Sequence, residues 1–80
     1  MEAYPNPFEN EVNVVIKNMT EGDFTLQLID NIGRVVYSEN CTTTESVFQT
    51  KLSLATLRSA VYNLRCITKG DVLNSRVVKR

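Results

Sequence analysis

The chain of 80 residues has no histidine, no tryptophan and only three glycines. Without histidine it cannot form a Ser/His/Asp or Cys/His arrangement for nucleophilic catalysis. The glycines are not spaced as a phosphate-binding loop. Two of the glutamates could approach each other as a glycosidase pair, but a domain of this size has little room for the cleft that such a pair needs. We therefore expect no catalytic residues and no cofactor.

Net charge is also lacking, because nine basic residues balance nine acidic ones. A neutral chain offers no long-range attraction for a polyanion, which argues against nucleic acid as a partner. No apolar run approaches the roughly 18–20 residues that a membrane-spanning helix requires. Asp30, Asn31 and Asp71 are too sparse for a Ca²⁺ site, and predicted turns already explain them. We expect no membrane span and no metal.

The two cysteines, Cys41 and Cys66, are too few for a disulfide framework and lack the spacing of a metal site. Cys66 alternates in phase with Tyr62 and Leu64, so we expect it to behave as a small buried hydrophobic residue. Cys41 stands among the polar residues 40–44, which we expect to form a loop. A disulfide between the two cysteines stays open at this point, because it depends on whether their Cβ atoms meet.

Apolar and polar residues alternate along most of the chain, and this period of two is typical of half-buried strands. The pattern predicts strands over residues 12–17, 24–28, 34–39, 46–54 (one strand or two), 61–68 and 72–79. The expected inward residues include Val12, Val14, Ile16, Phe24, Leu26, Leu28, Tyr62, Leu64 and Cys66. A single turn of helix could fit near Leu57. About six or seven short strands separated by turns predict an antiparallel β-sandwich.

Two turns are clearly marked between these strands. Asp30-Asn31-Ile32-Gly33 places Asp at the first position of a type I turn and a glycine that is free to take a positive φ. This turn predicts a hairpin over residues 24–39. Lys69-Gly70-Asp71 predicts a second tight turn before the last strand.

The segment Tyr4-Pro5-Asn6-Pro7-Phe8, called the proline hook below, contains both prolines of the chain. Each proline fixes its own φ, lacks an N–H and disfavours the α conformation in the residue before it. The pattern predicts a stiff, extended segment in which Tyr4 and Phe8 contact one hydrophobic surface together. A proline-punctuated domain boundary is the alternative interpretation. We expect residues 1–3 to be a linker or added residues, and residues 4–80 to be the domain.

Four motifs follow one another in order as far as the last residues. They are the proline hook, Leu28-Ile29-Asp30-Asn31-Ile32-Gly33-Arg34-Val35-Val36, Leu52-x-Leu54-x-x-Leu57-x-x-Ala60-x-Tyr62 and Ser75-Arg76-Val77-Val78-Lys79. Each motif is weak alone, but the ordered set is specific. The chain resembles the C-terminal sorting domain of the type IX (Por) secretion system of Bacteroidetes, and the resemblance covers residues 4–80.

The resemblance implies an immunoglobulin-like β-sandwich of seven strands at the end of a larger exported protein. In this family the cargo crosses the inner membrane with an N-terminal signal peptide, and the sorting domain is then read by the outer-membrane translocon. A sortase-like cysteine peptidase usually removes the domain upstream of the hook and often joins the cargo to a surface lipopolysaccharide. By this resemblance the cut lies at or before residues 1–3, outside the ordered domain, and the cargo passes through the periplasm to the cell surface or the medium.

The resemblance also assigns roles to single residues. Asp30 and Gly33 carry over as the turn of the central hairpin, and turn chemistry alone would explain them. Tyr62 is similar to the tyrosine corner of sandwiches, whose hydroxyl bonds upstream backbone, although core packing would explain it as well. Residues 77–79 carry over as the terminal strand that contacts the translocon. The alternative for this strand is an ordinary edge strand protected by basic side chains.

Arg34 and Leu57 complete the residues that the motifs assign to sorting. One departure concerns Ala60, because the family usually has glycine there. If the position requires a positive φ, Ala60 costs about 1 kcal/mol or shifts the turn.

Two other functions remain open. A fibronectin-III-like adhesive or carbohydrate-binding module would share the architecture, but carbohydrate binders display aromatic platforms, and the six aromatic residues here mostly fall in inward phase. An accessory domain that stabilises an enzyme is a third class. The place of the domain in the full-length protein distinguishes these three functions most clearly, since we expect a sorting domain to stand at the C-terminus.

Overall fold

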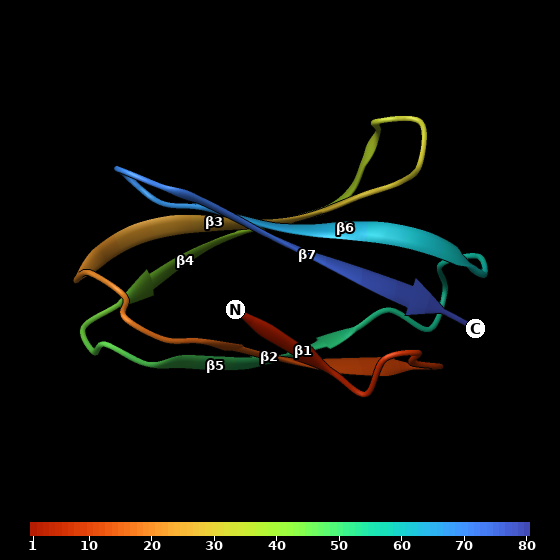
Figure 1. The fold of residues 1–80 in the computed structure, drawn as a ribbon, viewed down its shortest axis with the longest axis horizontal. Coiled ribbons are helices and arrows are strands. Elements are labelled where there is room, and N and C mark those ends of the chain that lie inside the picture. The colour runs from red at the N-terminus through yellow and green to blue at the C-terminus, as the bar shows by residue number, and fades with distance from the viewer.

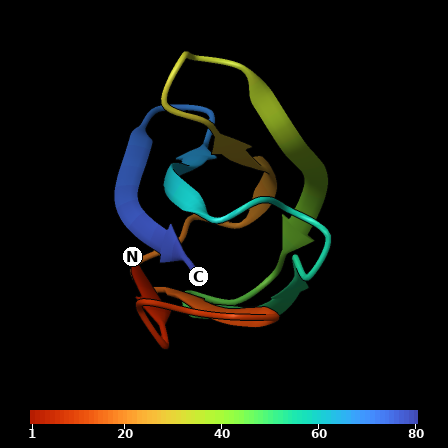
Figure 2. The same ribbon diagram turned by 90° about the vertical axis from the view of Figure 1, so that its right-hand side faces the viewer.

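The computed structural model describes residues 1–80 and contains seven strands. They are β1 (Glu2–Tyr4), β2 (Glu11–Ile16), β3 (Gly22–Ile29), β4 (Val35–Thr43), β5 (Phe48–Ser53), β6 (Ala60–Ile67) and β7 (Val72–Lys79). One sheet has the order β1-β2-β5 and the other the order β4-β3-β6-β7, with antiparallel neighbours throughout. The two sheets face each other (Figures 1 and 2), which confirms the predicted all-β sandwich.

The core lies between the sheets and is built mostly from alternate residues of their strands, as the period of two predicted, with Phe8 and Leu54 added from the connections. Its thirteen buried members are Phe8, Val12, Val14, Ile16, Phe24, Leu26, Leu28, Leu52, Leu54, Tyr62, Leu64, Cys66 and Val77. The rings of Phe24 and Phe48 add an edge-to-face contact with centroids 4.8 Å apart. Full burial of each large side chain stabilises the fold by about 1.5–3 kcal/mol.

The predicted loop at residues 40–44 is wrong, because β4 continues to Thr43. β4 is an edge strand whose side chains are mostly exposed, so its backbone pairs with β3 although its sequence is polar. Cys41 lies opposite Phe24 on one side of β3, and Cys66 lies opposite Leu26 on the other. Two strand spacings of about 4.8 Å exceed the ~7 Å limit between the Cα atoms of a disulfide. Both thiols are accordingly free.

The proline hook bends back instead of running extended, and both of its X–Pro peptide bonds are cis. The prediction that Tyr4 and Phe8 contact one hydrophobic surface is therefore wrong. Tyr4 pairs with Asn13 and is 51% exposed, whereas Phe8 lies beside Lys79 of the other sheet and is 1% exposed. The ordered sheet begins at Glu2 in β1, ahead of the predicted boundary at residue 4.

The connection between β5 and β6 forms a turn, in which the Leu57 N–H donates to the Leu54 carbonyl at 3.2 Å. The single helical turn that could fit near Leu57 does not form. None of the elements is a helix of the length and hydrophobicity needed to span a membrane. Ala60 begins β6 without a positive φ; Asn18 is the non-glycine residue that has one. Alanine is therefore unstrained at position 60.

Candidate functional site

All four motifs meet at one end of the sandwich, the right-hand end in Figure 1, which we call the motif end. β3 ends there and leads into the turn at Asp30. Across the sheet, Ile29 lies opposite Asn63 of β6, and Tyr62 lies opposite Val77 of β7. The hook then runs along the outside of β7. The hairpin turn, the tyrosine, the terminal strand and the hook thus form one continuous row.

Asn6 attaches the hook to β7 by imitating a peptide group. Its side-chain Nδ2 donates to the carbonyl of Arg76 at 3.0 Å, and its Oδ1 accepts from the N–H of Val78 at 2.9 Å. The flanking prolines have no N–H of their own, so an asparagine side chain supplies the donor that a strand would need here. The pairing covers backbone groups that an edge strand otherwise leaves open.

Phe8 continues the same pairing through its backbone and anchors it through its ring. The Phe8 N–H donates to the Val78 carbonyl at 2.9 Å, and the Arg80 N–H donates to the Phe8 carbonyl at 2.8 Å. The Phe8 ring is a member of the core, so the hook is held both by hydrogen bonds and by apolar burial. Together with Asn6, it occupies the edge of β7 from the Arg76 carbonyl to the Arg80 N–H.

The terminal strand presents two kinds of residue. Val77 and Lys79 point inward and are 0% and 7% exposed. The Lys79 stem is buried and its Nζ donates to the Arg80 backbone oxygen at 2.8 Å, which keeps the ammonium group hydrogen-bonded. Val78 is half-buried and Arg76 is exposed on the outward face. A partner could therefore contact Arg76 and Val78, whereas Val77 and Lys79 support the fold.

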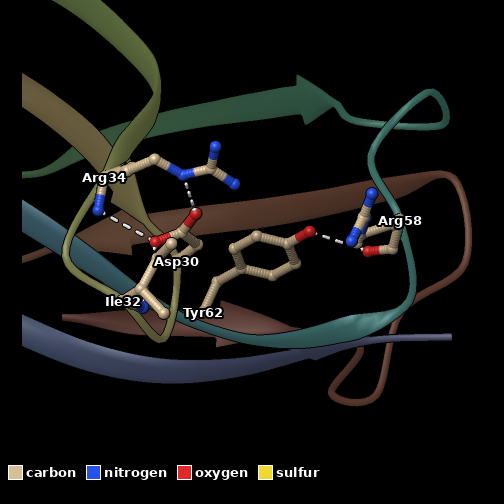
Figure 3. A network of polar contacts seen from close by, with 5 residues as sticks. All are labelled: Asp30, Ile32, Arg34, Arg58 and Tyr62. Carbon is tan, nitrogen blue, oxygen red and sulfur yellow. Dashed lines mark hydrogen bonds and ion pairs between the residues drawn. The ribbon is translucent and has the colours of Figure 1, made fainter.

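The turn at Asp30 is held by its own carboxylate (Figure 3). Oδ1 accepts from the N–H groups of Ile32 and Arg34 at 3.1 and 2.9 Å, and Oδ2 accepts from the Arg34 Nε at 2.8 Å. Gly33 takes φ of 89°, a conformation that favours glycine, and its N–H donates to the Asp30 carbonyl. Desolvation raises the pKa of Asp30, but the hydrogen bonds from Arg34 and Ile32 and the charge of Arg34 outweigh it, so the pKa lies below its ordinary value.

Tyr62 makes the bond expected of a tyrosine corner. Its hydroxyl donates to the carbonyl of Arg58, four residues upstream, at 2.7 Å (Figure 3). The bond fixes the end of the β5–β6 connection against β6, and the ring is buried in the core. Ile29 and Asn63, the neighbours of Asp30 and Tyr62 in the sequence, lie opposite each other, so the hairpin turn and the corner adjoin across β3 and β6.

Sequence reasoning found most of the residues that gather here and missed several partners. It placed the hook, Asp30, Gly33, Arg34, Tyr62 and the terminal strand in one set, and the structure brings these together. Leu57 is half-buried in the adjacent connection, and Tyr4 stands apart in β1. The bond from the Asn13 side chain to the Tyr4 carbonyl, at 3.2 Å, was missed, as was the pairing of Asn6 with β7. The sequence signal for the pairing of Asn6 with β7 was an asparagine placed between two prolines.

The site offers little chemistry beyond hydrogen bonding and packing. No group of three or more His, Cys, Asp or Glu side chains could hold a metal ion. Burial raises the pKa of the Cys66 thiol, and burial together with Glu39 raises that of Cys41. Both thiols are therefore protonated near neutral pH and are poor nucleophiles.

A family described as "Secretion system C-terminal sorting domain" matches residues 2–80 of the chain. The chain belongs to this family. A search of curated proteins found no match. Membership makes the domain a C-terminal sorting signal of the type IX secretion system, found in Bacteroidetes. Such a domain interacts with that secretion system and follows a cargo domain. The cargo is exported to the cell surface or the extracellular space. The family is in general non-catalytic.

Proposed function

We propose that this sorting domain is a folded sorting signal without catalytic activity, and that the outer-membrane translocon recognises it at the motif end. The observation that carries the proposal is the pairing of the hook with β7. Four hydrogen bonds hold residues near the start of the domain against its terminal strand. A translocon that binds this end would therefore contact both the proline hook, which follows the cargo, and β7.

The outward face of β7 is the part we propose the translocon contacts. Arg76 is exposed there and Val78 is half-buried, while the inward Val77 and Lys79 are needed for the fold. Deletion of residues 77–80 would remove a core side chain and the partners of Phe8, so it would mix unfolding with loss of recognition. A substitution of an outward side chain separates the two effects.

The test is export of a reporter that carries an inner-membrane signal peptide and this domain. Arg76→Glu reverses one exposed charge on the edge strand β7, and Lys51→Glu makes the same change on the edge strand β5 of the other sheet. We expect Arg76→Glu to reduce export at least tenfold and Lys51→Glu to leave it unchanged, with both domains folded by circular dichroism. Equal export of the two folded variants would refute reading through β7.

We also propose that a sortase-like cysteine peptidase removes the domain ahead of β1. Glu2–Tyr4 pair with β2, and the Asn13 side chain bonds the Tyr4 carbonyl. A peptidase needs an extended, unpaired substrate, so the paired residues favour a cut before Glu2. Mass spectrometry of the domain released from export-competent cells should give a fragment that begins at or before residue 2. A fragment that begins after Tyr4 would contradict this.

A further inference from the structure

The outer edge of β7 is divided into a covered half and an open half. In an antiparallel ladder, alternate residues turn their N–H and C=O groups toward one neighbour. Both backbone groups of Val78 bond the hook, so the even-numbered residues of β7 face away from β6, and the unbroken register keeps this phase along the strand. The hook stops at the Arg76 carbonyl. The backbone groups of Val72 and Asn74 and the N–H of Arg76 therefore face away from β6. β1 of the other sheet approaches β7 but does not pair with it, so these groups have no hydrogen-bond partner.

The charges of the neutral chain are unevenly distributed along the sequence. Residues 58–80 contain six basic side chains and one acidic side chain, a net charge of +5, so residues 1–57 carry −5. β6 and β7 make up most of the positive segment and lie next to each other in the sheet. Of these side chains, Arg65, Lys69 and Arg76 lie around the open half of β7 together with the acidic Asp71, so this half carries a net positive charge.

The side chains around the open half include two arginines and an exposed valine. Arg76 is exposed on β7, and Arg65 lies opposite Asn74 on the neighbouring strand. The Nε of Arg65 is buried without a hydrogen-bond partner, which is unfavourable until an acceptor arrives. Val72 is 52% exposed and gives an incoming strand an apolar contact.

We propose that the open half of β7, from Val72 to Arg76, is a β-augmentation site for an acidic, extended segment of a partner protein. Backbone hydrogen bonds would add the segment as a fifth strand of the four-stranded sheet, and its carboxylates would face Arg65 and Arg76. The inference deepens the proposed function, because it names the chemistry of the partner that β7 contacts. It rests on that function only for the identity of the partner.

Self-association and other edges fit the observations less well. Pairing of β7 with β7 of a second copy would bring like charges together, which is destabilising across strands. The outer edges of β4 and β5 carry single charged residues, Glu39 and Lys51. Compared with these two edges, the open half of β7 combines unpaired backbone with a net positive charge.

The test titrates the ¹⁵N-labelled domain with the capped peptide Thr-Glu-Val-Glu-Val-Thr and with a matched peptide that has lysine in place of glutamate. With the acidic peptide we expect NMR shifts at the Val72, Asn74 and Arg76 amides and at least tenfold slower hydrogen exchange of the Asn74 amide. The lysine peptide should cause neither change. Equal effects of the two peptides, or no shift over residues 72–76 at millimolar acidic peptide, would overturn the proposal.

Two substitutions at one position test the backbone contact. Asn74→Pro removes the outward N–H and spares the bonds to β6, since proline is tolerated where an edge strand faces solvent. Asn74→Thr keeps the N–H and, like the proline variant, loses the bond from the Asn63 side chain. We expect at least tenfold weaker peptide binding for Asn74→Pro and unchanged binding for Asn74→Thr.

Unchanged peptide binding by folded Asn74→Pro would overturn the site, and so would preferential binding of anionic phospholipid vesicles without protection of the Asn74 amide. Should the proline variant unfold, the exchange rates of the wild-type amides decide the question. Peptide binding is measured without secretion. A negative peptide-binding result would therefore not contradict the proposed export function. A negative export result would equally not contradict peptide binding at β7.

Discussion

Asn6 and Val78, 72 residues apart in the sequence, are joined by a hydrogen bond of 2.9 Å between the Asn6 Oδ1 and the Val78 N–H. The other end of the same carboxamide donates to the Arg76 carbonyl. The side chain thus takes the place that a peptide group of a neighbouring strand would occupy. It links the start of the sorting domain to the strand that ends it.

Replacing Asn6 should therefore weaken the whole domain. Asn6→Ala removes two hydrogen bonds, each with a net contribution of about 0.5–1.5 kcal/mol, so we expect the free energy of unfolding to fall by about 1–3 kcal/mol. Asn6→Asp keeps the acceptor and loses the donor, so its free energy of unfolding should lie between those of the wild type and Asn6→Ala. Urea denaturation measures all three proteins; an Asn6→Ala domain as stable as the wild type would show that the bonds contribute nothing.

Phe8 should contribute more than any other residue of the hook, because its ring is 1% exposed. We expect Phe8→Ala to lower the free energy of unfolding by about 3–5 kcal/mol, from lost burial and the cavity left behind. Tyr4→Ala is the matched control, since Tyr4 is an aromatic residue of the same segment that is half exposed. It should cost less than about 1 kcal/mol. Similar losses in the two variants would contradict the observed bend of the hook.

The tyrosine corner can be tested by removing one oxygen. Tyr62→Phe keeps the buried ring and leaves the Arg58 carbonyl without its donor, so we expect a loss of about 1–2 kcal/mol in thermal or urea unfolding. Tyr37→Phe removes a hydroxyl that bonds the exposed Glu39 carboxylate, and should cost about 0.5 kcal/mol or less. Burial, together with the hydrogen bond and charge of Glu39, raises the pKa of Tyr37 to about 12, which an absorbance titration can check.

The turn at Asp30 should make the stability depend on pH. Its pKa is lower in the folded state than the ordinary 3.8, so the ionised carboxylate stabilises the fold. This contribution is complete above the unfolded pKa and is lost as the pH falls through the folded pKa, below 3.8. Asp30→Asn should be less stable than the wild type at pH 6, and the difference should shrink toward pH 2. A difference that stays constant over this range would exclude the linkage.

The strands could be predicted because their side chains follow a period of two against one core. Val12, Val14 and Ile16 are all fully buried in β2, as the alternation indicated. The prediction failed at Cys41, where β4 pairs through its backbone while most of its side chains stay in solvent. An edge strand of this kind has no apolar alternation to detect.

The candidate site was predictable only in part, since local chemistry is visible in sequence and distant pairing is not. The Asp30–Gly33 turn depends on residues within five positions, and both the turn-forming role of Asp30 and the positive φ of Gly33 were predicted. The bonds of Asn6 to β7 depend on how the two sheets pack, which no local pattern encodes. For the same reason the inward direction of Lys79 was not foreseen, because its neighbours in the motif do not show which face of β7 meets the core.

The central claim is that this domain directs export by the type IX system. The most direct measurement compares a signal peptide–fluorescent protein–domain fusion in a bacterium with an intact type IX system and in a strain without its translocon. We predict fluorescence at the surface or in the medium of the intact strain alone. A folded fusion that stays in the periplasm of both strains would contradict the claim and favour an adhesive module.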